Sequence, residues 1–509
     1  MMRKSSSIDP RDHTRLVLKY AISSRLLLIT LISLWRSFLS PYDTSAFIYP
    51  GCLSSADANA NADTDPQLLF PHVASALEGS IVWDSVYYVR IAQCGYEYEQ
   101  SYAFFPLLPI CISLLSRTVF APLIPIIGHK AVLGLSGYVL NNIAFVFTAL
   151  YIYRLSILIL NDSEVALRAS ILFCFNPASV FYSSIYSESL YAVFSIVGLY
   201  NLLGHANNVA TLCFALSGAA RSNGMLNAGY FCFQAMHQAY DAIILKKHAS
   251  LALPVVVSGA FRCFCIFIPF VSFQAYGYLN ICRRHAEDEM IPWCRARIPL
   301  LYDHIQSHYW GVGFLKYFQV KQLPNFLLAT PVLSLAICSI VYYVKLSPKV
   351  FFSLGLGAFP ANKELFAYII PPGTTGEPET PGSLEDETSS TLQDAQSLRQ
   401  RKRFTKGWST VRNVSLQSGN VSSEGRACLP VLVIPFILHT GFMAATAFLV
   451  MHVQVATRFL SASPLLYWFA SHVMMTPSIA KRWGYFIWVY CASYILIGSL
   501  LFSNFYPFT

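Results

Sequence analysis

Long apolar runs recur along this chain, and they constrain its fold more than any other feature. A transmembrane helix needs about 20 consecutive apolar residues, and in lipid only a helix satisfies all its backbone hydrogen bonds within one segment. Hydrophobic residues make up 55% of the sequence and charged residues only 12%. We therefore predict an all-α polytopic membrane protein with roughly 10–13 transmembrane helices. The clearest runs are 20–39, 131–153, 252–280, 325–345, 429–453 and 484–503, and more broken ones are 103–127, 165–187, 189–203, 208–232 and 462–476.

The distribution of charge predicts how the chain is oriented. Basic residues precede the first run, which favours a cytosolic N-terminus and a retained signal anchor. The loop 41–102 that follows holds eight acids against one base, Arg90, and therefore fits the non-cytosolic side. The basic residues behind the net charge of +9 are scattered over loops, so we expect no nucleic-acid partner.

Composition also divides the chain into regions. Residues 1–370 and 428–509 are two membrane regions, separated by an insertion at 371–427. The insertion is rich in Gly, Pro, Ser, Thr and Glu before it turns basic, which predicts a disordered cytosolic loop. Counting spans places a second loop, 281–324, outside. That loop carries six bases against four acids, so either the topology differs there or the bases bind an anion.

Cysteine and histidine patterns give little support to a metal site. The thirteen cysteines lie mostly inside apolar runs and form no Cys-x-x-Cys pair, so we expect neither a disulfide framework nor a zinc site. His304 and His308 have the spacing of zinc ligands on a helix, but Ile305 stands where a metalloprotease has glutamate. Asp63 and Asp65 imitate a metal-binding acid pair within a low-complexity run. We expect no metal and no cofactor.

A few charged side chains stand out because their surroundings are apolar. Asp84 follows Trp83 at the membrane surface and is a candidate general base, although a solvated loop acid would look the same. Glu188, Arg221 and Arg458 lie beside or within apolar runs, where a charge costs about 2.5–3.5 kcal/mol to insert. Such residues face a polar cavity or a partner, or they snorkel at the end of a span.

Five sequence blocks occur in an order that resembles one known family, the PIG-V mannosyltransferases. Each block is weak alone, but together they cover nearly the whole chain outside the insertion. They are Trp83-Asp84 through Ile91–Tyr96 with Ala103-Phe104-Phe105-Pro106; Asn176-Pro177-Ala178 with Tyr186-Ser187-Glu188; Arg221-Ser222-Asn223-Gly224; Pro292-Trp293-Cys294 through Tyr309-Trp310-Gly311 to Pro324–Leu327; and His452–Phe459 with Tyr467-Trp468.

The resemblance implies a specific activity. It implies the GT-C glycosyltransferase fold with a long first lumenal loop, in the membrane of the endoplasmic reticulum. It implies dolichyl-phosphate mannose as donor and a glycosylphosphatidylinositol (GPI) precursor that bears one mannose as acceptor, extended through an α1,6 bond. Val82, the segment around Cys94 and the insertion 371–427 depart from the family pattern. The resemblance leaves open whether a small membrane subunit is needed.

Converting a β-linked lipid-phosphate sugar into an α-linkage requires a single displacement with inversion. That step needs a base for the attacking hydroxyl and cations for the departing phosphate. We assign Asp84 as the base. Candidates for the phosphate are, in order, Arg458, Lys316, Arg221 and Lys321. The remaining candidate substrate-binding residues are Trp83, Phe104, Phe105, Glu188, Asn223, Trp310 and Gln454.

Three other functions stay open at this point. One is a different dolichol-phosphate-sugar transferase of the same architecture. Another is a polytopic transporter, although the long outer loop and the absence of paired broken helices in matching halves do not suggest alternating access. The third is a catalytically inactive scaffold.

Overall fold

The computed structural model describes residues 10–42, 52, 68–284, 292–356, 423–476 and 480–506. Every regular element in this part of the chain is a helix, so the all-α prediction is confirmed there. Most of the predicted insertion lies outside the described residues, as do Asp63 and Asp65. Its last residues, 423–427, already belong to α17.

Six of the described helices are long and apolar enough to cross a membrane. They are α1 (Pro10–Phe38), α6 (His129–Leu160), α12 (Ala249–Ile281), α14 (Leu323–Leu346), α17 (Ser423–Leu449) and α20 (Ala480–Ser503). A seventh span is counted if α4 (Leu107–Arg117) continues through a 67° bend into the segment that ends in α5 (Ile124–Ile127). The polytopic prediction is confirmed, but this count is lower than the predicted 10–13 because the more broken runs form shorter helices.

The shorter helices lie between the long ones and carry most of the conspicuous charged residues. They are α7 (Ser163–Cys174), α8 (Ser179–Ser183), α9 (Glu188–Leu203), α10 (Asn207–Ala220), α11 (Ala228–Tyr240), α18 (Ala456–Leu460) and α19 (Pro464–Met475). Polar residues set several of their ends. The Asp162 carboxylate accepts hydrogen bonds from the first backbone amides of α7, and the Asn176 amide donates to the carbonyl of Phe173 just after that helix ends.

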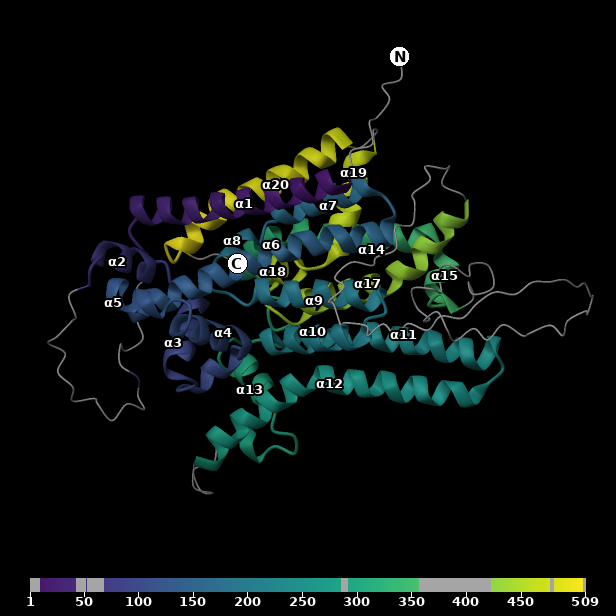
Figure 1. Ribbon diagram of the computed structural model, residues 1–509, viewed down its shortest axis with the longest axis horizontal. Helices are drawn as coiled ribbons and strands as arrows, with labels where there is room; N and C mark the ends of the chain where they lie inside the picture. Colours follow the sequence, from purple (N-terminus) through teal and green to yellow (C-terminus); the bar gives the residue numbers. More distant parts are fainter. Residues whose placement is uncertain are drawn as a thin grey trace, which may run out of the picture.

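The described parts of both predicted outer loops lie at the same end of the molecule. Figure 1 shows α2 (Pro71–Gly79), α3 (Asp84–Cys94) and α13 (Leu301–His308) toward the left. The start of α1, the turn between α11 and α12, and α15 (Pro348–Phe352) lie toward the right. The lumenal and cytosolic assignment of these two ends stays a prediction from the sequence.

Two disulfides correct the prediction made from the cysteines. Cys52 pairs with Cys94, and Cys282 pairs with Cys294. Each bond lies within one of the two predicted outer loops. The sequence prediction was wrong because it weighed the majority of cysteines, which lie in apolar runs, above the few that lie outside them.

A buried arginine that the sequence analysis missed joins α1 to the centre of the protein. The Arg25 side chain is 3% exposed, and its guanidinium donates to the carbonyl of Ser179 and the hydroxyl of Ser183. It also stacks 3.6 Å from the centre of the Phe145 ring. Arg25 therefore fixes α8, the short helix that carries Phe181 into the site described below.

Candidate functional site

Asp84 begins α3 directly after a strained residue. Trp83 has a φ of 53°, in the left-handed region that bulky residues rarely adopt. Its indole Nε1 donates to the carbonyl of Phe502 at 3.1 Å, and its ring lies 5.7 Å from that of Phe505. The backbone N–H of Asp84 donates to the hydroxyl of Tyr186 at 3.1 Å. Trp83 thus anchors the loop to the C-terminal segment and orients the carboxylate that follows it.

Four charged side chains, distant in the sequence, meet at this point, and we call them the charge cluster: Asp84, Glu188, Arg221 and Arg458. Glu188 Oε1 is shared by two guanidinium groups, lying 2.8 Å from Arg458 Nε and 2.6 Å from Arg221 Nη1. Arg458 Nη2 reaches across to Asp84 Oδ2 at 3.4 Å. The cluster joins α3, α9, α10 and α18, so two acids and two bases face one another at the junction of four helices.

Local structure explains why each member points into the cluster. Glu188 is the first residue of α9, where the helix dipole favours a negative charge. Arg221 follows α10 in an extended conformation, because Gly224 packs directly on the α10 backbone. A Cβ on Gly224 would lie 2.3 Å from the carbonyl carbon of Ser217. Only glycine allows this approach, which accounts for the glycine in the block Arg221-Ser222-Asn223-Gly224.

Arg458 is held between aromatic rings as well as carboxylates. Its guanidinium carbon lies 4.4 Å from the centre of the Phe181 ring and 4.8 Å from that of Tyr186. Stacking and ion pairing fix the plane of the guanidinium, whose five N–H donors include several not used by the two acids. The Arg458 side chain is 14% exposed, so an anion that reaches it could accept from those donors.

Exposure and basicity separate the two carboxylates. The Glu188 side chain is 1% exposed, whereas that of Asp84 is 39% exposed, so a substrate can reach only Asp84 directly. Burial of the carboxyl raises the pKa of Asp84 above its usual range, the Arg458 guanidinium opposes this, and the nearby Glu188 adds to it. Asp84 is therefore both the more accessible acid and a stronger base than an ordinary aspartate.

A group of packed aromatic rings, Tyr87, Phe104 and Trp310, lies at α3, the helix that Asp84 begins. The Phe104 ring stacks on Tyr87 at 4.7 Å between centroids, and Trp310 meets its edge at 6.4 Å. Phe105 turns the other way and is 2% exposed, packed among other rings such as Phe273 at 5.0 Å. Phe104 and Trp310 thus lie together. Phe104 is 8% and Phe105 2% exposed, so of these three rings only the half-buried Trp310 offers appreciable surface to a substrate.

The other predicted substrate-binding residues lie outside the charge cluster. Lys316 and Lys321 are exposed, and neither forms an ion pair with a described residue. Asn223 is 6% exposed, and its amide makes no hydrogen bond within the described part of the chain. The side-chain oxygen of Gln454 is likewise buried without a described partner. The Asn223 amide and the Gln454 side-chain oxygen therefore retain unused hydrogen-bonding capacity in buried positions, whereas the two lysines face outward.

The histidine pair has a structural explanation. The rings of His304 and His308 stack 5.2 Å apart, and His304 Nε2 lies 3.4 Å from Glu99 Oε1. The indole of Trp293 donates to the same Glu99 oxygen at 2.9 Å. Glu99 therefore ties the first outer loop to the second.

Two residues that position the site were given no role by the sequence analysis. Tyr186 was quoted in a family block, yet it holds the backbone of Asp84 and stacks on Arg458. Asn141, in α6, donates from its amide to the carbonyl of Tyr186 at 2.9 Å and is fully buried. The available signal was an asparagine inside the apolar run 131–153, where a polar side chain needs a partner.

Comparisons with known proteins agree with the sequence blocks. The family described as Mannosyltransferase (PIG-V) matches residues 14–509. The chain is 28% identical to GPI alpha-1,6-mannosyltransferase 2 of Homo sapiens over 487 residues, covering 91% of this chain and 85% of the relative. It is 27% identical to GPI mannosyltransferase 2 of Drosophila melanogaster over 535 residues, covering 97% of this chain and 100% of the relative. No solved structure matches. The chain belongs to the PIG-V family of mannosyltransferases.

Proposed function

We propose that this protein transfers the second mannose, in α1,6 linkage, from dolichyl-phosphate mannose to a GPI precursor that bears one mannose. The names of its relatives support the acceptor and the linkage. The observation that carries the chemistry is the contact between an accessible carboxylate, Asp84, and a guanidinium, Arg458, at the meeting point of four helices. This displacement requires a base for the attacking hydroxyl and a cation for the departing phosphate, and the charge cluster offers both.

We assign a role to each member of the charge cluster. Asp84 takes the proton from the attacking 6-hydroxyl of the acceptor mannose. Arg458, supported by Arg221, stabilises the phosphate that leaves from the opposite face of the donor sugar, so the configuration inverts. Glu188 holds both guanidinium groups at fixed positions. The contact between Asp84 and Arg458 is long, at 3.4 Å, so an arriving phosphate can draw Arg458 away and leave Asp84 more basic.

Substrate contacts are assigned to the side chains that retain accessible surface or free polar atoms. Trp310, backed by the Phe104 ring, which is only 8% exposed, can stack on a sugar ring, and Asn223 and Gln454 offer amide atoms to its hydroxyls. Trp83 positions Asp84 rather than contacting the sugar. Lys316, in the loop that follows α13, is exposed and is assigned to attracting the anionic lipid rather than to the reacting atoms.

The proposed location is the membrane of the endoplasmic reticulum, with the site on the lumenal side. The disulfides Cys52–Cys94 and Cys282–Cys294 support this orientation, because disulfides persist in oxidising compartments such as that lumen. Each of the two predicted lumenal loops contains one of these disulfides.

The proposal is tested by removing the protein from cells and identifying the GPI lipid that accumulates. We expect a precursor with a single mannose, and purified protein with dolichyl-phosphate mannose should extend it by one α1,6-linked residue. Accumulation of a different intermediate would contradict the proposed acceptor. Rescue of the cells by a protein that transfers no mannose in vitro would indicate a scaffold instead.

Arg458→Lys should reduce transfer far more than it reduces the amount of folded protein. Lysine keeps the charge but loses the planar fork that contacts Glu188, Asp84 and a phosphate together. We expect kcat to fall by about 10²–10³-fold, the usual loss when a group that stabilises developing charge is removed. Arg15→Lys, at an arginine of α1 whose side chain is 84% exposed, is the matched control and should leave kcat unchanged. Unchanged turnover with less protein would show that Arg458 is structural.

Turnover should depend on pH through Asp84. Because only the ionised carboxylate accepts a proton, kcat should fall as the pH drops through the pKa of Asp84. Since that pKa is raised, the decline should be centred above the ordinary aspartate value of about 3.9. Steady-state rates over a pH series, corrected for enzyme lost during preincubation, measure it. Full activity down to the ordinary aspartate range would contradict the assigned role.

A further inference from the structure

Phe502, near the end of α20, packs against the aromatic rings that support the charge cluster. Its side chain is 2% exposed, and its ring lies 5.3 Å from that of Phe181 and 5.5 Å from that of Tyr186. Those two rings lie 5.2 Å from each other, and the Arg458 guanidinium stacks on both of them. Phe502 therefore contacts both of the rings that hold Arg458.

The backbone of Phe502 contacts the other side of the cluster. Carbonyls in the last turn of a helix have no partner within it, and Phe502 lies one residue before α20 ends at Ser503. Its carbonyl accepts instead from the indole Nε1 of Trp83 at 3.1 Å. Trp83 directly precedes Asp84, whose backbone N–H donates to the Tyr186 hydroxyl. Phe502 is thus joined to Asp84 by two routes, one through its carbonyl and one through its ring.

The end of α1 fixes the end of α20. Arg36 Nη1 donates to the carbonyl of Ser503 at 3.3 Å, and the backbone N–H of Tyr42 donates to the carbonyl of Asn504 at 2.8 Å. Both acceptors directly follow Phe502 in the chain. The place of Phe502 is therefore set by α1, the helix that also fixes α8.

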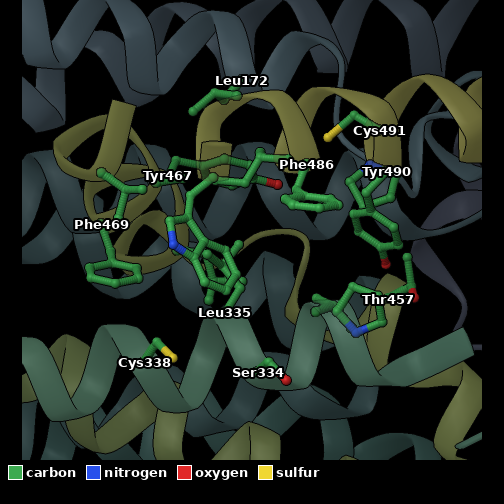
Figure 2. A pocket seen from close by; sticks show the side chains of 18 of the residues that line it. Leu172, Ser334, Leu335, Cys338, Thr457, Tyr467, Phe469, Phe486, Tyr490 and Cys491 are labelled. Atoms are coloured by element: carbon green, nitrogen blue, oxygen red, sulfur yellow. The ribbon is translucent and has the colours of Figure 1, made fainter. Parts of the chain in front are cut away.

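Packing around α18 is incomplete on the side of Thr457. This residue, which precedes Arg458, lines an apolar cavity of about 460 Å³ between α14, α19 and α20 (Figure 2), and Arg458 itself is not among the lining residues. Atoms in the wall of a cavity lack packing partners on that side and lose the corresponding dispersion energy. The aromatic contacts of Arg458 therefore matter more for its position than they would in a fully packed region.

We propose that Phe502 is a positioning residue that sets the separation of Asp84 and Arg458, an inference that rests on the proposed function. It touches neither reacting group. It acts on the base through Trp83 and Tyr186, and on the cation through the two supporting rings. The contact that it sets, 3.4 Å between Arg458 Nη2 and Asp84 Oδ2, is already longer than an ordinary charged hydrogen bond. A misplacement of about 1 Å at a reaction centre can cost about 10²-fold in rate.

Replacing the ring tests this role. Phe502→Leu keeps the carbonyl that accepts from Trp83 but removes the ring contacts. We expect kcat to fall about tenfold, with the KM values for donor and acceptor nearly unchanged, because no substrate contact is lost. Phe436→Leu is the matched control, since Phe436, on α17, is also 2% exposed and also packs on two rings, those of Tyr230 at 5.3 Å and Trp468 at 5.0 Å.

The control separates positioning from a general loosening of the core. Phe436→Leu should lower the thermal denaturation midpoint about as much as Phe502→Leu, but each folded molecule should keep the kcat of the unaltered protein. Normal kcat in Phe502→Leu, or an equal fall in both variants, would overturn the inference.

The pH profile gives a second readout that a purely structural role would not move. Asp84 is faced by the guanidinium groups of Arg458 and Arg221, the carboxylate of Glu188, and the phenols of Tyr88 and Tyr186. Burial raises the pKa of Asp84 and Arg458 opposes this most, so a looser contact lets that pKa rise further. The acidic decline of kcat should therefore move to higher pH in Phe502→Leu and stay in place in Phe436→Leu. A decline at the same pH in all three proteins would contradict the proposal.

Hydrogen exchange of the Asp84 backbone N–H tests the proposal without turnover. This group donates to the Tyr186 hydroxyl, so it should exchange faster in Phe502→Leu than in the unaltered protein or in Phe436→Leu, as measured by mass spectrometry of the peptide that contains it. Equal exchange in the three proteins would refute the positioning role. If exchange differs as expected but the unaltered protein transfers no mannose from dolichyl-phosphate mannose, the proposed function fails and the positioning role stands.

Discussion

Asp84→Asn should abolish mannose transfer while leaving the protein folded. Asparagine has the same shape, and its backbone N–H still donates to the Tyr186 hydroxyl. An amide cannot accept the proton of the attacking hydroxyl, and loss of general base catalysis costs about 10²–10⁴-fold in rate. Transfer to the singly mannosylated precursor should fall by this factor, measured with purified protein in detergent. The KM for the donor should change far less.

Asp303→Asn is the matched control, since Asp303 is an exposed acid in the second outer loop. It should retain the rate of the unaltered enzyme. Near-normal transfer by Asp84→Asn would mean that Asp84 is not the base. A comparable fall in Asp303→Asn would show that the effect comes from the charge of the outer surface rather than from proton transfer.

Glu188→Gln should give the largest loss of stability among single changes in the charge cluster. Glu188 Oε1 lies within 2.8 Å of two guanidinium nitrogens and is almost completely buried. Neutralising it leaves Arg221 and Arg458 facing each other without their shared acid. Removing one partner of a buried ion pair typically costs about 3–5 kcal/mol. We expect a lower thermal denaturation midpoint in detergent and less protein in the membrane.

Glu164→Gln supplies the comparison for this change. Glu164 pairs with Arg168 on the surface of α7, where both side chains are more than 40% exposed. Exposed pairs contribute about 0–1 kcal/mol, so stability should hardly change. If the two glutamine variants are equally stable, Glu188 does not hold the arginines together.

The sequence predicted the membrane helices best where apolar runs are long and uninterrupted. The runs 131–153 and 252–280 lie within α6 and α12, because length and hydrophobicity decide a span almost alone. The run 208–232 instead divides at Arg221 into separate helices. Whether a polar residue interrupts a helix depends on partners elsewhere in the fold, which the local pattern does not contain.

The individual residues of the candidate site could be predicted from the sequence, but their arrangement in space could not. Glu188, Arg221 and Arg458 stood out because charges are costly in apolar surroundings, yet nothing local indicated that one glutamate serves both arginines. Phe104 and Phe105 are neighbours with equal hydrophobicity, and only the fold separates their directions. The disulfides were missed for the same reason, since pairing is a property of distance and not of composition.

The balance of charge in the cluster has a consequence for turnover inside a low-dielectric environment. When Asp84 gains a proton, the cluster changes from neutral to singly positive. In the same step the donor's phosphodiester becomes a phosphomonoester with one further negative charge. The reaction is therefore electroneutral where it occurs, and no counter-ion must be drawn into the membrane. Release of that proton through the exposed edge of Asp84 then resets the enzyme for another cycle.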